Sequence, residues 1–409
     1  MEATLQSIFR STYESYRKEH GLSMEQIKAA QAIMDCQSEA LGHEEWVCRN
    51  DGHVERQHHS CRHRSCPRCN GSQSREWLEK IKAKLLPCDH YHVVFTLPHE
   101  LNAIWQYNRS WCSDRLFQAT AETLRELLKD ERYLGAEVGL ISSLHTWGRT
   151  FVFHPHMHVL VTGLGLRREE TRQLEKDFLL PVGVLKAKFR GKWLSYLNQA
   201  YDRGDITLPE DWTELEWRRV LRKVARKSWN IRIQGAYKHG DGVALYLSRY
   251  VRGGPVKDKK IISANKKRVI FQYKDHHDGK NKMMPLPTEH FTTRVLWHVA
   301  VKGQHQVRHY GLYASSARVK RDKVREKLGI EVEQAFHKPE EVPKTCPECG
   351  HVLFHAMSTR REISYIKSGR VIHVQQAVAT DRDRSDLPIG WHSIDTSPPF
   401  FYAVRRPLN

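Results

Sequence analysis

The chain has 409 residues, enough for two or three domains with a sizeable hydrophobic core. Its 66 lysines and arginines outnumber its 47 acidic residues, and the resulting formal net charge of +19 favours a polyanionic partner. No apolar run reaches the roughly 18 residues of a transmembrane helix, so we expect no membrane association. The N-terminus also lacks the basic and then apolar pattern of a signal peptide.

The nine cysteines are grouped around CxxC pairs, which in a chain without an export signal favours metal binding over disulfides. We therefore expect a cytoplasmic protein. Before the first pair, residues 1–40 show a helical apolar stripe through Leu5, Phe9, Tyr13 and Tyr16. A capping box at residues 23–26 predicts the start of a second helix.

The stretch from residue 46 to residue 70 has the composition of a zinc-binding domain. Cys66 and Cys69 form a CxxC turn, and Cys48 and Cys61 complete the four thiolates that a structural zinc ion requires. His53 and His63 are alternative ligands or neighbours of the ligands. Basic residues lie between the cysteines and are candidates for contacts with DNA phosphates: Arg62, Arg64 and Arg68.

Residues 90–162 predict strands at 90–97, 137–146 and 154–162 and a helix over 102–133. In the last strand, His156 and His158 share one face and Met157 points to the other, because side chains alternate along a strand. Two imidazoles placed in this way are typical of a divalent metal site. The strands at 137–146 and 154–162 are separated by a turn, and we expect them to pair as a hairpin, which makes His145 our preferred third ligand. His154 and a distant acidic residue are the alternatives.

The next part of the chain is charged and mostly helical over 167–228, followed by a strand at 229–237. A helix then carries Tyr246 and Tyr250, which are neighbours on one face because they are four residues apart. A strongly basic stretch follows, with strands expected at 261–263 and 269–274, and with a helix at 291–301, an extended segment at 305–313 and a basic helix at 318–327. The DNA-binding candidates in this region are Arg249, Lys266, Lys267 and Arg268.

A second CxxC turn, Cys346 and Cys349, lies near the end of the chain and predicts a possible second zinc site. Two cysteines are not enough for such a site, so its other ligands would be His351, His355 or residues from elsewhere. We expect the polar residues after 357 to form a tail.

Together these features form a coherent site for DNA strand transfer. A metal held by the histidines would polarise and orient a scissile phosphate. A tyrosine oxygen would attack it and leave a 3′-hydroxyl and a 5′-phosphotyrosine, which conserves the phosphodiester energy for a joining step. The second tyrosine allows two successive transfers.

The sequence resembles the HUH endonuclease superfamily, and in particular the IS91-type rolling-circle transposases. The resemblance covers most of the chain, through SCRHRSCPRC, VVFTLPHEL, HTWGRTFVFHPHMHVLVTG, YLSRYV, FTTRVLWHV, RHYGLYA and CPECG. It implies a nickase and ligase for single-stranded DNA that uses Mg²⁺ or Mn²⁺, with Tyr246 and Tyr250 as its nucleophiles. It also implies an α+β fold with a central antiparallel sheet of RRM-like topology, flanking helices and an N-terminal helical and zinc-binding region.

One departure from the family concerns the first cysteine motif, which often reads CxxCG. Here Asp51 occupies the second cysteine position. Either Asp51 or His53 substitutes for it, or the zinc is held by Cys48, Cys61, Cys66 and Cys69, which we prefer.

The predicted organisation is N-terminal helices at 1–40, a zinc-binding domain at 41–85, a nuclease domain at 86–330 with inserted helices at 167–228, and a C-terminal region at 331–409. We expect a bacterial, nucleoid-associated protein whose partners are single-stranded element ends and target DNA. Two other functions fit the pattern: a plasmid replication initiator or relaxase of the HUH class, and a non-catalytic zinc-dependent nucleic-acid-binding protein.

Overall fold

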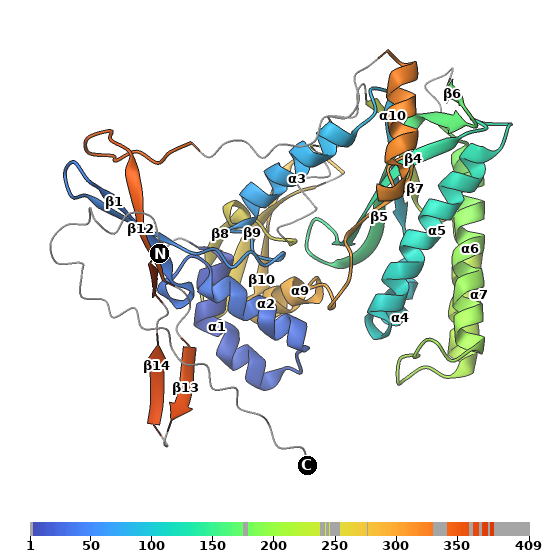
Figure 1. Cartoon of the computed structure of the whole chain (residues 1–409). Coiled ribbons are helices and arrows are strands. Elements are labelled where there is room, and N and C mark those ends of the chain that lie inside the picture. Colours follow the sequence, from blue (N-terminus) through green and yellow to red (C-terminus); the bar gives the residue numbers. More distant parts are fainter. Residues whose placement is uncertain are drawn as a thin grey trace. The chain divides into compact units, whose positions relative to one another are not determined.

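The computed structural model describes residues 3–174, 179–237, 242, 245, 254–275, 277–329, 342–359, 363–367, 370–374 and 377–379. The chain forms two compact units (Figure 1). The main unit comprises residues 1–37 and 60–341, and the small unit comprises residues 38–59 and 342–409. The chain therefore leaves the main unit after residue 37 and returns to it at residue 60, inside the stretch 41–85.

The main unit begins with two helices, α1 (Leu5–Glu19) and α2 (Met24–Asp35), as the apolar stripe and the capping box predict. The Ser23 hydroxyl accepts a hydrogen bond from the Gln26 backbone, and the Gln26 side chain accepts one from the Ser23 backbone. The amide group of Gln6 in α1 donates to backbone carbonyls at the end of α2, including that of Cys36 at 2.7 Å. This contact fixes the residue that follows α2.

An antiparallel sheet is the centre of the main unit, and together with the helices it confirms the predicted α+β class. Its strands lie in the order β11 (Val307–Gly311), β4 (Glu137–Trp147), β5 (Phe153–Arg167), β3 (His90–Thr96) and β7 (Ile231–Tyr237), with β6 (Glu170–Gln173) paired to β5. Strands β4 and β5 form the predicted hairpin, in which His145 pairs with His156 and Ser143 with His158.

Helices cover both faces of this sheet. One face packs against α4 (Asn102–Tyr107), α5 (Arg109–Lys129), α6 (Val182–Asp202) and α7 (Glu214–Arg226), where the side chains of Val93, Met157 and Val159 are fully buried. The other face packs in part against α3 (Asn70–Lys84) and α10 (Arg318–Lys327), through residues such as Ile141 and Leu160. Short 3-10 helices occur at His99–Leu101 and Ser315–Ala317.

A smaller sheet packs on the N-terminal helices within the main unit. Its strands lie in the order β10 (Asn281–Pro287), β9 (Arg268–Lys274) and β8 (Ile261–Ala264), and it is flanked by α9 (Thr288–Trp297) and a 3-10 helix at Asp258–Lys260. Phe151 at the tip of the β4–β5 hairpin is 1% exposed and packs against Phe271 and Phe291. The tip of the hairpin is thus anchored in this second core.

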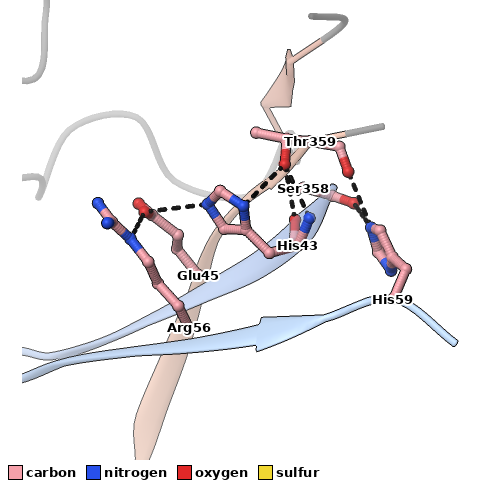
Figure 2. A network of polar contacts seen from close by, with 6 residues as sticks. All are labelled: His43, Glu45, Arg56, His59, Ser358 and Thr359. Carbon is pink, nitrogen blue, oxygen red and sulfur yellow. Dashed lines mark hydrogen bonds and ion pairs between the residues drawn. The ribbon is translucent and has the colours of Figure 1, made fainter. Parts of the chain in front are cut away.

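The small unit contains a four-stranded antiparallel sheet in the order β15 (Ala377–Ala379), β12 (Leu353–Thr359), β1 (His43–Cys48) and β2 (Val54–His58). A hairpin of β13 (Ile363–Lys367) and β14 (Arg370–Val374) and a 3-10 helix at Glu39–Leu41 also belong to it. Figure 2 shows the polar network at one end of β1, where the Thr359 hydroxyl accepts from the His43 backbone at 2.9 Å. The region expected to hold a tail therefore contains strands as far as residue 379.

Candidate functional site

Three histidines meet on one face of the central sheet. His156 and His158 of β5 lie beside His145 of β4, and one ring nitrogen from each lies within 4.8 Å of the others. Met157, between them, is fully buried on the opposite face, as the strand alternation predicts. The structure thus brings together the three histidines that the sequence names as metal ligands.

Hydrogen bonds fix which nitrogen of two of these rings is available. The Nδ1 of His156 donates to the carbonyl of His154 at 2.6 Å, which leaves its Nε2 free to bind a metal. The Nδ1 of His158 lies 2.8 Å from Nε2 of His92, and the Nδ1 of His92 lies 2.7 Å from Oε1 of Gln234. Since the Gln234 oxygen only accepts, His92 donates to it and accepts from His158. This hydrogen bond engages Nδ1 of His158, so Nε2 is the nitrogen through which that ring would bind a metal.

The relay through His92 and Gln234 was not predicted from the sequence. His92 lies on β3, which pairs with β5, and its partner there is Leu160. Gln234 lies on β7, on the far side of β3, and pairs with His92. Partners that orient a ligating imidazole in this way tune the affinity of metal sites. The alternation of side chains along HYHVVFTL predicts that His92 and His90 share a face, but it does not give the register of this strand against its neighbours.

Burial keeps these imidazoles neutral, which is the form that binds metal ions. It lowers the pKa of His156 to about 4, and it lowers those of His145 and His158 well below their usual value. Repulsion between the clustered rings lowers the pKa of each further. The other candidates for third ligand are not in this group: His154 lies outside it, and it includes no carboxylate among the described residues.

The three histidines open into a cavity of about 910 Å³. Its wall is strongly basic, and the cationic residues that line it are Arg149, Arg232, Lys257, Lys259, Lys260 and Lys274. Burial and the neighbouring charges of Lys259 and Arg149 lower the pKa of Lys260. An anion in this cavity would relieve that repulsion, so the arrangement suits a phosphodiester.

The predicted nucleophiles Tyr246 and Tyr250, and with them Arg249, lie outside the described residues. The described chain resumes at Gly254 and Pro255, which both line the cavity. Gly254 adopts φ +61°, and a Cβ there would lie 3.1 Å from the carbonyl oxygen of Ser65. This close approach requires glycine at that position.

The remaining DNA-binding candidates do not line the cavity. Lys266, Lys267 and Arg268 are exposed at the turn between β8 and β9, and Arg62 is exposed before the first CxxC turn. Arg64 is half-buried. Arg68 donates to the side chains of Gln6 and Gln37 and so has a structural partner.

The cysteines of the first zinc site form a group that differs from the predicted one. Cys61, Cys66 and Cys69 lie together with Cys36, whereas Cys48 lies in the small unit, so the prediction that Cys48 belongs to this set was wrong. Cys36 follows α2 as an isolated cysteine, and sequence spacing does not distinguish it from Cys48. The Sγ atoms of Cys61 and Cys69 are 3.6 Å apart. Tetrahedral zinc with bonds of about 2.3 Å requires about 3.8 Å, so four thiolates here fit the ion.

Cys48 instead joins Asp51, Cys346 and Cys349 in a second group within the small unit. The second CxxC turn therefore does acquire partners from a distant part of the chain. Neither His351 nor His355, which the sequence offered as ligands, belongs to the group.

Comparisons with known proteins agree with these features. Residues 139–322 match the family model described as "Putative transposase", and residues 8–97 match the "Transposase zinc-binding domain". The latter range contains the Cys36 group, whose donors fit zinc. No solved structure matches the chain. None of the described helices is long and apolar enough to cross a membrane.

Two curated relatives align with most of this chain. It is 35% identical to the "Putative transposase y4qJ" of Sinorhizobium fredii over 80% of this chain and 84% of that protein. It is 28% identical to the "Transposase for insertion sequence element IS801" of Pseudomonas savastanoi pv. phaseolicola over 73% of this chain and 72% of that protein. The chain therefore belongs to the IS91-type transposase family, which combines a transposase domain with a zinc-binding domain.

Proposed function

We propose that this transposase nicks and rejoins single-stranded DNA through a 5′-phosphotyrosine intermediate, as in rolling-circle transposition. The observation that carries the proposal is the group of His145, His156 and His158 at the base of a basic cavity. In the proposal the central antiparallel sheet is of the RRM-like HUH type, and the protein acts on bacterial DNA in the cytoplasm.

The histidine group has the chemistry of a divalent metal site with open positions. Its three imidazoles are neutral, and two of them present Nε2 because their Nδ1 atoms are engaged elsewhere. When bound, Mg²⁺ or Mn²⁺ would polarise the scissile phosphate as a Lewis acid. Imidazole nitrogens favour Mn²⁺ over the harder Mg²⁺. We therefore expect Mn²⁺ to bind more tightly.

The basic wall holds the substrate against this centre. Arg149 and Lys260 can pair with phosphate oxygens of a strand in the cavity, since both line the same cavity as the histidines. The histidines themselves are largely buried: His145 is 2% exposed and His158 is 5% exposed. An unpaired strand can bend a phosphodiester into such a recess more readily than a duplex can, which supports single-stranded DNA as the substrate.

The tyrosines carry the covalent step in this proposal. The phenolic oxygen of Tyr246 or Tyr250 loses its proton and bonds to phosphorus, while the bond from phosphorus to the 3′-oxygen breaks. The 3′-oxygen takes up a proton and leaves as a hydroxyl, and the phosphate stays on the tyrosine as a diester. The reverse reaction with a new 3′-hydroxyl rejoins the DNA. No oxidant, reductant or nucleotide cofactor is needed.

A plasmid replication initiator or relaxase would use the same chemistry, but both named relatives are transposases, which favours transposition. A non-catalytic DNA-binding protein would not need three converging neutral imidazoles beside a basic cavity. The cavity and its histidines therefore favour an enzyme over a binding module.

A covalent-adduct assay tests the proposal. Single-stranded DNA covering the element ends is incubated with protein and Mn²⁺ and separated on a denaturing gel, with Tyr246→Phe, Tyr250→Phe and the double variant alongside. We expect an adduct that requires metal and is absent from the double variant. DNA binding without an adduct in the wild-type protein would contradict the covalent mechanism.

A further inference from the structure

Two segments of the small unit, far apart in the sequence, form the same kind of turn. Residues 48–53 read CRNDGH and residues 346–351 read CPECGH. In the first, the Cys48 amide donates to the His53 carbonyl at 2.8 Å and the Gly52 amide donates to the Cys48 carbonyl at 3.0 Å. In the second, the Cys346 amide donates to the carbonyl of His351 at 2.7 Å, and the Gly350 amide donates to that of Cys346 at 2.9 Å.

The two glycines reinforce the equivalence of these turns. Gly52 has φ +76° and Gly350 has φ +75°, a conformation that other residues rarely adopt. A turn of this kind aims its first and fourth side chains at one point, as in CxxC metal turns. Those positions are Cys48 and Asp51 in one turn and Cys346 and Cys349 in the other.

The four side chains of these positions converge. The Sγ atoms of Cys48 and Cys349 are 3.5 Å apart, and Sγ of Cys346 is 3.3 Å from Oδ2 of Asp51. One ligand atom from each of the four residues lies within 4.8 Å of all the others. The thiol pair is too far apart for a disulfide bond of about 2.05 Å and close to the spacing of about 3.8 Å around tetrahedral zinc.

We infer that the small unit holds a second zinc ion, bound by the thiolates of Cys48, Cys346 and Cys349 and by the carboxylate of Asp51. Asp51 takes the position that a thiolate, Cys349, occupies in the matching turn. Both Cys48 and Cys346 are buried, with 0% and 3% exposure, so the ion would be sheltered on the thiolate side. This site is separate from the Cys36 group, and it does not depend on the nuclease mechanism.

The ion would join two distant segments of the chain. Cys48 and Cys349 are 301 residues apart in sequence, and Cys48 ends β1 while β12 begins four residues after Cys349. The other end of the β1–β12 pair is held by Thr359, which bonds to His43 and accepts from His59 at 2.8 Å (Figure 2). The metal would thus hold β1 and β12 together at one end of the pair, and this polar network holds them at the other.

Zinc stoichiometry tests the inference. The full-length protein is purified without chelator, and its zinc content is measured by elemental analysis and native mass spectrometry. We expect two zinc ions per chain in the wild type, one in Cys36→Ser, one in Cys346→Ser and none in the double variant. A wild-type protein with one zinc ion, which Cys36→Ser removes and Cys346→Ser does not, would overturn the second site.

Variants at Asp51 test its role as a ligand without deleting a cysteine. Asp51→Asn keeps the shape of the side chain but weakens it as a ligand. A chelator should then remove one of the two zinc ions at least about tenfold faster. This effect is comparable with the loss of a residue that hydrogen-bonds to a metal ligand. Asp51→Cys should slow that release, because thiolates bind zinc more tightly than carboxylates. Glu348→Gln makes the same carboxylate-to-amide change at an exposed side chain of the other turn, so it is the matched control and should leave release unchanged. His351→Ala is measured alongside.

The Asp51 variants remain informative if Cys346→Ser does not fold. Equal release rates for wild type, Asp51→Asn and Asp51→Cys would remove Asp51 from the site. Loss of zinc in His351→Ala, with Asp51→Asn unaffected, would assign the fourth position to His351. Neither result bears on the covalent-adduct assay, so failure of this site and failure of the nuclease proposal are distinguishable.

Discussion

His92 contacts the histidine centre without belonging to the group that would hold the ion. Its Nε2 accepts from Nδ1 of His158, and its Nδ1 donates to Gln234. We predict that His92→Ala lowers Mn²⁺ affinity by about 10–100-fold, because His158 loses the partner that sets its tautomer and orientation. Isothermal titration calorimetry measures the change.

Two variants separate this positioning effect from loss of structure. His92→Gln offers an amide oxygen that can accept from His158, so it should restore part of the affinity. His90 lies on the same strand and bonds to the hydroxyl of Tyr313 at 2.6 Å instead of to the centre. His90→Gln should bind Mn²⁺ like the wild type. Undiminished affinity in His92→Ala would show that the relay does not position His158.

Sequence patterns could identify side chains that share a strand face or follow a motif spacing. They predicted that His156 and His158 point the same way, and the hairpin made His145 their preferred partner. They could not identify Gln234, because its role depends on the register of β3 against β7. They also could not choose Cys36 over Cys48, because an isolated cysteine carries no spacing signal.

At the scale of elements, α9 holds the tip of the β4–β5 hairpin beside the site. His298, the residue that ends this helix, donates from Nε2 to the Phe151 carbonyl at 3.0 Å, and its Nδ1 lies 3.0 Å from the Thr146 hydroxyl. Burial lowers the pKa of His298 to about 4, against the opposing effect of the Phe151 carbonyl, and the charge of Arg109 lowers it slightly more. The neutral ring is therefore part of the folded state.

This depressed pKa predicts how stability depends on pH. The unfolded chain binds a proton at His298 below a pH of about 6.5, whereas the folded chain binds it only near pH 4. The contribution of His298 is present in full above pH 6.5 and is lost as the pH falls from 6.5 towards 4. We expect thermal unfolding to show a smaller decrease in Tm from pH 7 to pH 5 in His298→Gln than in the wild type.

The exposed His290 on the same helix provides the matched control. His290→Gln should retain the wild-type dependence of Tm on pH. If His298→Gln retains it as well, the contact between α9 and the hairpin does not depend on a neutral imidazole.

Prediction from the sequence was most successful for elements whose pattern is local. The strands of the central sheet and the helices α1, α2 and α10 follow from alternation, apolar stripes and caps. The pairing of β1 with β12 could not be foreseen, because these strands are short and lie at opposite ends of the chain. Their partners are set by contacts that no local window contains.

At the scale of the whole molecule, the net charge of +19 predicts a polyanionic partner but not where that partner binds. Three of the four cavity lysines, Lys257, Lys259 and Lys260, line the same cavity as the histidines, whereas Lys266, Lys267 and Arg268 lie at an exposed turn. We expect replacement of these three cavity lysines by Gln to reduce the slope of log K against log salt for single-stranded DNA by about 2, at about 0.7 for each lost phosphate contact.

Fluorescence anisotropy across a range of salt concentrations measures this slope. The turn triple variant with Gln at positions 266–268 carries the same change in charge and is the control, so it should change the slope less. A larger effect of the turn variant would place the DNA backbone outside the cavity.

The division into two units also exceeds what a sequence pattern can show. The chain enters the small unit at residue 38, leaves it after residue 59 and returns at residue 342. A reading in chain order joins neighbouring residues into one domain, so it assigned Cys48 to the same zinc site as Cys61. Contacts between segments that are distant in the sequence place Cys48 in the small unit and Cys61 in the main unit.

The most direct test of a catalytic metal centre at these histidines is Mn²⁺ binding, measured by electron paramagnetic resonance. It is measured on zinc-loaded wild-type protein and on the His156→Ala/His158→Ala double variant. The same samples are assayed for the covalent DNA adduct and for single-strand affinity. We predict that the double variant loses one bound Mn²⁺ and all adduct while its DNA affinity stays within about twofold, because the basic wall is intact. Equal Mn²⁺ binding and adduct formation in both proteins would contradict a catalytic metal centre at these histidines.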